Sequence, residues 1–243
     1  MTVYRTAITL MISLVFCGTV HAYDITWDYL DRTGWGVGAK SDNDEHGNIG
    51  VWDYFKAPEG STTHTTYSGS LNWYASSTRW ITGTTYPGSG NDGWFMIDYS
   101  YLHPGLASDP TIAFYAPETG VYDFSVTLWN SNTTPEAAQY GNGQYFYLQK
   151  FSTVLVSEYN AKQATSTLTK TNVSLNEGDA VYLRVNANDY EGYDIVTIQN
   201  FIITGHFTDP EPPVEPPAVP EPASAALIIA AITGLLFRKR SRI

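Results

Sequence analysis

Residues 120–129 read GVYDFSVTLW, and this stretch decides the expected fold. Large apolar residues alternate here with polar ones, so that Tyr122, Phe124, Val126 and Leu128 are interleaved with Asp123, Ser125 and Thr127. Successive side chains of a β-strand point to opposite faces. The alternation therefore predicts a strand with one buried and one solvated face.

The same strand character recurs on both sides of this stretch. Further strands are expected at residues 111–115, 144–150, 153–159, 165–173, 180–185 and 194–204. Turn-forming residues separate them at 117–120, 142–143, 176–178 and 186–188. No window shows a sustained helical period of apolar residues. The pattern predicts an all-β domain over residues 23–207, an antiparallel β-sandwich with the strand arrangement of a jelly roll.

The first 22 residues have the organisation of a signal peptide. Arg5 precedes the apolar run 7–16, and Val20-His21-Ala22 places small residues where a signal peptidase cleaves. We expect export and a mature chain that begins at Tyr23. The alternative is a retained N-terminal anchor, but the run is shorter than the roughly 20 residues that a membrane span needs. The single cysteine lies within this leader, so the exported domain must be stable without disulfides.

The body of the chain is strongly acidic. Without Arg5 and the four basic residues of the C-terminal tail it holds 8 basic and 24 acidic side chains, a net charge near −16. Such a charge repels the phosphates of nucleic acids and other polyanions, while it leaves divalent cations as possible partners. Nucleic-acid binding is therefore excluded as an expected function.

The C-terminal segment combines three features in order. Residues 208–222 contain 7 prolines among 15 residues, which favours a semi-rigid linker of roughly 45 Å. Residues 223–237 are 15 uncharged, mostly apolar residues, and we expect a short transmembrane helix there. The basic tail 238–243 is expected to stay in the cytoplasm, which would place the domain outside.

This tail resembles the PEP-CTERM sorting signal of Gram-negative bacteria that make exopolysaccharide. The resemblance rests on Val219-Pro220-Glu221-Pro222, on the hydrophobic helix and on Arg238-Lys239-Arg240 at the very end. It implies that an exosortase-type membrane enzyme is the partner that cleaves near the motif. The protein would then be anchored only transiently in the inner membrane before it reaches the cell surface or extracellular matrix. The alternative is a permanent single-span anchor behind a proline-rich stalk.

A second resemblance covers residues 47–204. Short motifs in this region are similar to a jelly-roll domain that recurs in exported planctomycete-type and PEP-CTERM proteins, itself similar to carbohydrate-binding modules of galactose-binding-like architecture. The motifs are residues 48–54, 102–105, 114–122, 175–183 and 194–198. The resemblance implies binding of an extracellular polysaccharide, as in a biofilm matrix.

The sequence carries little catalytic chemistry. It has no Gly-x-Ser-x-Gly, the mature part has no cysteine, and the motif HExxH is absent. A glycosidase needs two positioned carboxylates, and nothing singles out a pair among the acidic residues. We therefore expect a non-catalytic protein that binds glycans. A purely structural surface protein and, less favoured, a secreted glycoside hydrolase stay open.

One loop resembles a calcium-binding pattern. Residues 42–53 place Asp42, Asp44 and Asp53 at the first, third and twelfth positions and Gly47 at the sixth, as an EF-hand loop does. His46 stands where that loop has Asp or Asn, and the flanks are not helical. Calcium at Asp42, Asp44 and Asp53 is thus one hypothesis, and a solvated acidic loop is the other.

Aromatic residues are the remaining signal, because sugars stack on Trp and Tyr rings beside polar groups. Five tryptophans sit among small polar residues compatible with exposed rings: Trp27, Trp35, Trp73, Trp80 and Trp94. Trp73, Tyr74 and Trp94 are the candidate glycan-binding residues. The alternative is that these rings belong to the core.

Overall fold

The computed structural model describes residues 21–36, 38, 41–58, 68–83, 94–136, 142–188 and 194–208. Residues Ala22–Thr208 form one compact unit. The predicted signal peptide, apart from His21 and Ala22, lies outside the described residues. So do the predicted linker after Thr208, the predicted helix 223–237 and the basic tail. Within the described ranges, no helix is long and apolar enough to cross a membrane.

Among the described residues, strands make up nearly all the regular structure, and the two named helices are short 3₁₀ helices. The elements are β1 (Ala22–Asp28), η1 (Tyr29–Asp31), β2 (Ser41–Asp42), β3 (Trp52–Pro58), β4 (Asn72–Tyr74), η2 (Ala75–Ser77), β5 (Arg79–Ile81), β6 (Met96–Ile97), β7 (Tyr101–His103), β8 (Ser108–Tyr115), β9 (Gly120–Asn130), β10 (Gln144–Lys150), β11 (Thr153–Asn160), β12 (Thr165–Leu175), β13 (Ala180–Asn186) and β14 (Val196–Thr208).

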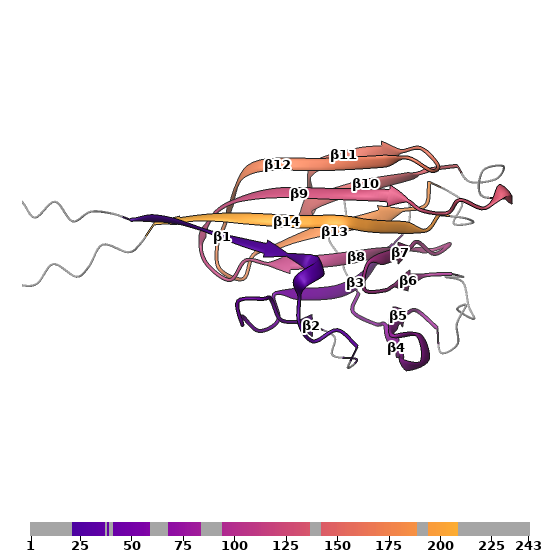
Figure 1. Ribbon diagram of the computed structural model, residues 1–243, viewed down its shortest axis with the longest axis horizontal. Coiled ribbons are helices and arrows are strands. Elements are labelled where there is room, and N and C mark those ends of the chain that lie inside the picture. Colours follow the sequence, from indigo (N-terminus) through magenta and orange to yellow (C-terminus); the bar gives the residue numbers. More distant parts are fainter. Residues whose placement is uncertain are drawn as a thin grey trace, which may run out of the picture. The chain divides into compact units, whose positions relative to one another are not determined.

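The strands form two antiparallel sheets. The eight-stranded sheet has the order β12-β9-β14-β7-β6-β5-β4, and β1 also pairs with β14. The six-stranded sheet has the order β11-β10-β13-β8-β3-β2. Figure 1 shows β1 and β14 side by side. The first residue of β1, Ala22, pairs with the last residue of β14, Thr208.

The two sheets pack face to face, as the alternating strands predict. Trp27 of the eight-stranded sheet contacts Phe114 of the other sheet at a ring distance of 5.5 Å. Trp52 and Phe201 make the same kind of contact at 5.3 Å. All four rings are fully buried. The predicted antiparallel β-sandwich is thereby confirmed. Large aromatic rings stabilise it, because truncation of one such core ring to alanine typically lowers the free energy of unfolding by about 3–5 kcal/mol.

The strand order is that of a jelly roll. The four strands β1-β14-β9-β12 face the four strands β8-β13-β10-β11, and the chain crosses from one sheet to the other at almost every connection. Only β10 and β11 follow each other as a hairpin within this set. The strands β2 to β7 extend the two sheets beyond these eight.

The predicted strands agree with the observed ones. Residues 144–150 coincide with β10, and the other six predicted segments fall on β8, β9 and β11 to β14. In β9 the side chains of Tyr122, Phe124, Val126 and Leu128 are buried, as the alternation predicts. No strand was predicted at β1 to β7. Five of these seven strands have only two or three residues, which gives too little periodic signal.

Candidate functional site

Three tyrosine rings lie in a row on the outer face of the six-stranded sheet. In β10, Phe146 and Leu148 point into the core, so Tyr145 and Tyr147 point outward. Tyr159 of β11 lies directly opposite Tyr145. The ring centroids of Tyr145 and Tyr159 are 5.2 Å apart, and those of Tyr145 and Tyr147 are 6.2 Å apart. We call Tyr145, Tyr147 and Tyr159 the tyrosine strip.

The strip is exposed at one end and sheltered at the other. Tyr159 is 47% exposed and Tyr145 is 37% exposed, whereas Tyr147 is buried. Tyr145 and Tyr147 are inclined by only 30° to each other, so their faces follow nearly the same direction. The two exposed rings, Tyr145 and Tyr159, are inclined by 55° and are the ones on which a sugar can stack.

Hydrogen bonds hold the exposed end in place. The hydroxyl of Tyr159 donates to the carbonyl of Asn142 at 2.6 Å. Gly143 makes this possible, because a Cβ at that position would lie 2.6 Å from the Tyr159 hydroxyl, and its φ of +83° favours glycine. The Asn142 side chain in turn donates to the carbonyl of Asn188. The ring of Tyr159 is therefore preorganised rather than free to rotate away.

A buried ion pair lies beside the strip. The Arg184 guanidinium packs on the ring of Tyr147 at 4.1 Å and donates to Asp109 Oδ2 at 2.5 Å. Its Nε donates to Gln149 at 3.2 Å, and Asn186 donates to Asp109 at 3.1 Å. Burial raises the pKa of Tyr147, so this ring stays a neutral hydroxyl. Because Arg184 and Asp109 balance each other, the pair adds no net charge to the face.

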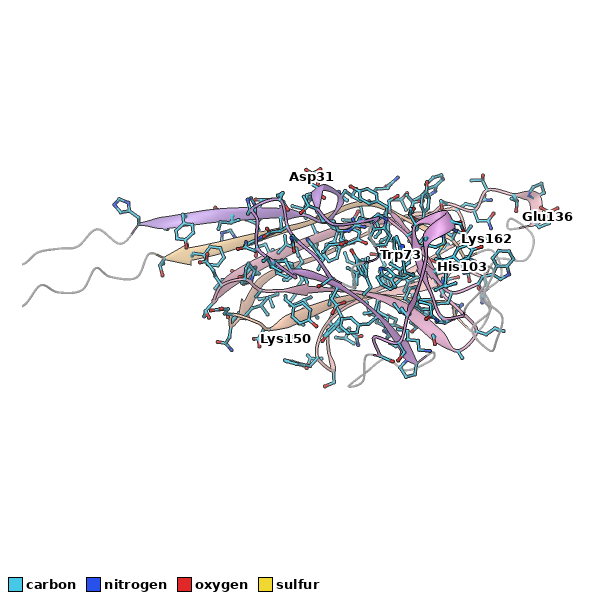
Figure 2. All side chains as sticks on the ribbon, turned by 90° about the horizontal axis from the view of Figure 1, so that it is seen from below. Asp31, Trp73, His103, Glu136, Lys150 and Lys162 are labelled. Atoms are coloured by element: carbon cyan, nitrogen blue, oxygen red, sulfur yellow. The ribbon has the colours of Figure 1, made fainter. Side chains whose placement is uncertain are left out.

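The candidates Trp73, Tyr74 and Trp94 lie elsewhere. Trp73 on β4 is half-buried, and its ring contacts Trp80 at 5.2 Å and Trp35 at 5.6 Å. Tyr74 next to it is also half-buried, whereas Trp94 is 46% exposed and contacts His103 at 6.3 Å. Figure 2 shows Trp73 and His103 toward the same end of the domain, away from Lys150.

Two other tryptophans differ from the expectation of exposed rings. Trp27 is 0% exposed and Trp80 is 5% exposed. Their small polar neighbours in the sequence occupy the other face of a strand or a connecting loop, while the ring enters the core. For these two the core interpretation is the one that the structure supports.

The loop 42–53 does not bring its three aspartates together. Asp42 accepts hydrogen bonds from Arg32 at 3.2 Å and from the Tyr54 hydroxyl. Asp44 accepts from the Trp27 indole and from the side chain of Asn48, each at 2.7 Å, while Asp53 accepts from the backbone of Tyr54. Among the described residues, no three His, Cys, Asp or Glu side chains are placed to hold a metal ion. In this geometry Asp42 and Asp44 brace β1 and η1 against β3.

The tyrosine strip was missed from the sequence, although a signal was present. In the predicted strand 144–150, Tyr145 and Tyr147 alternate with Phe146 and Leu148. Both sets are aromatic or aliphatic, so the alternation does not say which set faces the core. The pairing with β11 decides this, because it sets Tyr159 against Tyr145.

Comparison with known proteins gives structural likenesses only. No protein-family model matches the chain, and no curated protein matches it in sequence. Among solved structures, the chain is similar to a CBM36 domain of a xylanase from the hindgut metagenome of Trinervitermes trinervoides, with 13% identity, a TM-score of 0.29, and coverage of 63% of this chain and 96% of that one. The chain is also similar to a xylan-binding module, CBM15, with 13% identity, a TM-score of 0.29, and coverage of 76% of this chain and 97% of that one.

An adhesin domain of Lys-gingipain from Porphyromonas gingivalis is similar at 10% identity and a TM-score of 0.36, with coverage of 76% of this chain and 99% of the other. At these identities and scores the likenesses assign no function to this chain.

Proposed function

We propose that this domain is a non-catalytic module that binds a neutral extracellular polysaccharide on the tyrosine strip. The observation that carries the proposal is the row of adjacent rings formed by Tyr159, Tyr145 and Tyr147. The ring of Tyr159, which its hydroxyl fixes by a hydrogen bond, loses little freedom when a sugar stacks on it, and this favours binding. Beside the strip, the side chains of Asn142 and Asn188 donate to each other's backbone carbonyls, which holds this region in place.

The electrostatics favour a neutral ligand. The body of the chain carries a net charge near −16, which repels polyanionic glycans at moderate ionic strength. The charges of Arg184 and Asp109 compensate each other beside the strip. A hydroxyl-rich, uncharged polysaccharide therefore fits the face better than a polyuronate does.

Substitution of the strip tests this proposal. The intact chain is first screened on a glycan array, and the affinity for a retained glycan is then measured by calorimetry. We expect Tyr145→Ala and Tyr159→Ala each to weaken binding about fivefold, since a lost stacked ring is worth on the order of 1 kcal/mol. Tyr101→Ala, a tyrosine 43% exposed on the other sheet, is the matched control and should bind normally.

The same assay separates the remaining alternatives. If Trp94→Ala or Trp73→Ala abolishes binding while Tyr145→Ala does not, the candidates Trp73, Tyr74 and Trp94 form the site instead. No retention of any glycan would leave a structural surface protein. Release of reducing ends from a bound polysaccharide would favour a glycoside hydrolase.

The C-terminal segment supports a proposal about sorting. We propose that an exosortase-type enzyme cleaves near Val219-Pro220-Glu221-Pro222, with the apolar residues 223–237 and the cluster Arg238-Lys239-Arg240 holding the motif at the membrane. In its support, β14 ends at Thr208, where the proline-rich linker begins, so the motif follows the folded unit by a spacer. The protein would then be released to the cell surface or matrix.

Mass spectrometry of the protein from its native host tests the sorting proposal. The expected C-terminal peptide ends before Leu227. An intact chain ending at Ile243 in the membrane fraction, in cells that contain the enzyme, would contradict processing and leave a permanent anchor.

A further inference from the structure

Three buried amide side chains lie at one end of the sandwich interior. Asn130 is the last residue of β9 and lies on the same face as the core residues of that strand. Gln144 is the first residue of β10 and points inward, as Phe146 does. Asn160 ends β11 and lies directly opposite Gln144. These residues are at most 1% exposed. We call Asn130, Gln144 and Asn160 the amide cluster.

The cluster spans both sheets. The Asn160 amide donates across the core to the carbonyl of Leu128 at 3.4 Å, and Leu128 is two residues from Asn130 on the same strand. Figure 2 shows Glu136 and Lys162, which follow β9 and β11 in the chain, toward the same end of the domain. The cluster therefore closes the core at the end where β9 and β11 finish.

Five buried polar atoms of the cluster have no hydrogen-bond partner. They are the oxygens Asn130 Oδ1, Gln144 Oε1 and Asn160 Oδ1 and the nitrogens Asn130 Nδ2 and Gln144 Nε2. A buried polar atom without a partner is costly, and native proteins supply such atoms with a partner, an ordered water or an ion. Three such oxygens at the same end of the sandwich indicate a bound group rather than three separate defects.

A buried carboxylate lies at the same end. Asp194 is 0% exposed and stands two residues before Val196, which pairs with Asn130. Ile195, between them, is bound to the end of β9, because the backbone N–H of Ser131 donates to its carbonyl at 2.8 Å. Asp194 supplies a negative charge that three neutral amides lack.

We propose that Asn130, Gln144, Asn160 and Asp194 form a calcium-binding site inside the sandwich. Calcium takes six to eight oxygen ligands and accepts amide carbonyls as readily as carboxylates. Magnesium demands a near-ideal octahedron and keeps several waters, which suits a closed amide set less well. A thiophilic or imidazole-binding metal would find no sulfur or nitrogen ligand among these four residues.

The site differs from the aspartate loop predicted from the sequence. That loop lies between β2 and β3, and its carboxylates accept hydrogen bonds from Arg32, Trp27 and the Tyr54 backbone. The amide cluster joins β9, β10 and β11 instead. It also lies directly beneath the exposed end of the tyrosine strip, since Gln144 and Asn160 are the chain neighbours of Tyr145 and Tyr159.

Calorimetry with calcium chloride on the intact, EDTA-treated chain tests the proposal, with magnesium chloride as the matched ion. We expect calcium to bind and to raise the melting temperature, and magnesium to do so at least about tenfold more weakly. Asp194→Asn should weaken calcium binding about tenfold or more. Asp53→Asn, in the aspartate loop, should leave calcium binding unchanged.

A second variant is expected to strengthen calcium binding rather than weaken it. Asn130→Asp adds a carboxylate to the site, so it should tighten calcium binding roughly tenfold and lower the melting temperature in EDTA. If calcium has no effect on the unmodified chain, or if Asn130→Asp destabilises it equally in calcium and in EDTA, the cluster holds water and the proposal is overturned. Loss of binding in Asp53→Asn but not in Asp194→Asn would overturn it in favour of the loop.

Discussion

Arg32 shows how one buried charge joins distant parts of the chain. Its Nη1 donates to the carbonyl of Tyr29 at 2.6 Å, its Nη2 to that of Tyr99 at 2.8 Å, and its Nε to Asp42 and to the Tyr54 hydroxyl. The guanidinium also lies 3.6 Å from the ring centre of Tyr29. Burial raises the pKa of Asp42, although the Tyr54 hydroxyl and Arg32 counteract this. The ion pair thus fixes η1 on the sandwich more than it adds net stability.

His103 leads to a prediction about pH. Burial lowers the pKa of this histidine from 6.5 to about 4. Between pH 6.5 and about pH 4 the unfolded chain therefore binds a proton on this histidine that the folded chain does not. The contribution of the neutral His103 to stability is fully present above pH 6.5 and is lost as the pH falls toward 4.

In denaturant titrations we expect His103 to account for a loss of roughly 3 kcal/mol between pH 7.5 and pH 4. His103→Asn should lose less stability than the unmodified chain over this range. Parallel losses in the two proteins would show that His103 titrates normally in the folded state.

At the scale of elements, β14 organises the larger sheet. It pairs with β9 along most of its length, and on its other edge it pairs first with β7 and then with β1. The register shifts between Ile198 and Asn200, which is the point between these two partners. A bulge bends a strand and increases its local twist, so that one strand can pair with two neighbours that run in different directions.

The bulge depends on one side chain. Asn200 Oδ1 accepts the backbone N–H of Thr127 at 2.8 Å and so replaces a ladder carbonyl. We expect Asn200→Ala to lower the free energy of unfolding by about 1–2 kcal/mol, because it removes this acceptor. Asn200→Asp keeps the oxygen and should cost less, as measured by urea denaturation. Equal losses would mean that the side chain has no role in the bulge.

At the scale of the whole molecule, the first strand completes the domain. β1 pairs with β14 over all seven of its residues, and its Trp27 is fully buried against Phe114 and Tyr122. The resemblance to a jelly-roll domain covered only residues 47–204, which leaves out β1 and η1. The structure places both within the compact unit Ala22–Thr208.

Truncation tests this role of β1. A chain that begins at residue 47 lacks Trp27 and Arg32 and exposes the edge of β14, so we expect it to lose cooperative thermal unfolding. A chain of residues 22–208 should melt in one transition and give a β-rich circular dichroism spectrum. A helix-dominated spectrum of the longer chain, or a cooperative melt of the shorter one, would contradict this account.

The sequence by itself determined the strands β8 to β14, because a period of two is a local property. Alternation in β9 and the turn residues at 142–143 and 176–178 depend only on near neighbours. The acidic charge of the body and the order of linker, apolar stretch and basic cluster can also be read without a fold.

Only the tertiary structure decided which rings face solvent and which partner each carboxylate has. Trp27 and Trp94 have similarly polar neighbours in the sequence, yet one is 0% and the other 46% exposed. Asp42 and Asp44 are two residues apart, but one faces Arg32 and the other faces Trp27. Tyr145 meets Tyr159, and Asn130 lies near Asn160, through strand pairing and the packing of two sheets. These are non-local contacts, and local periodicity contains no information about them.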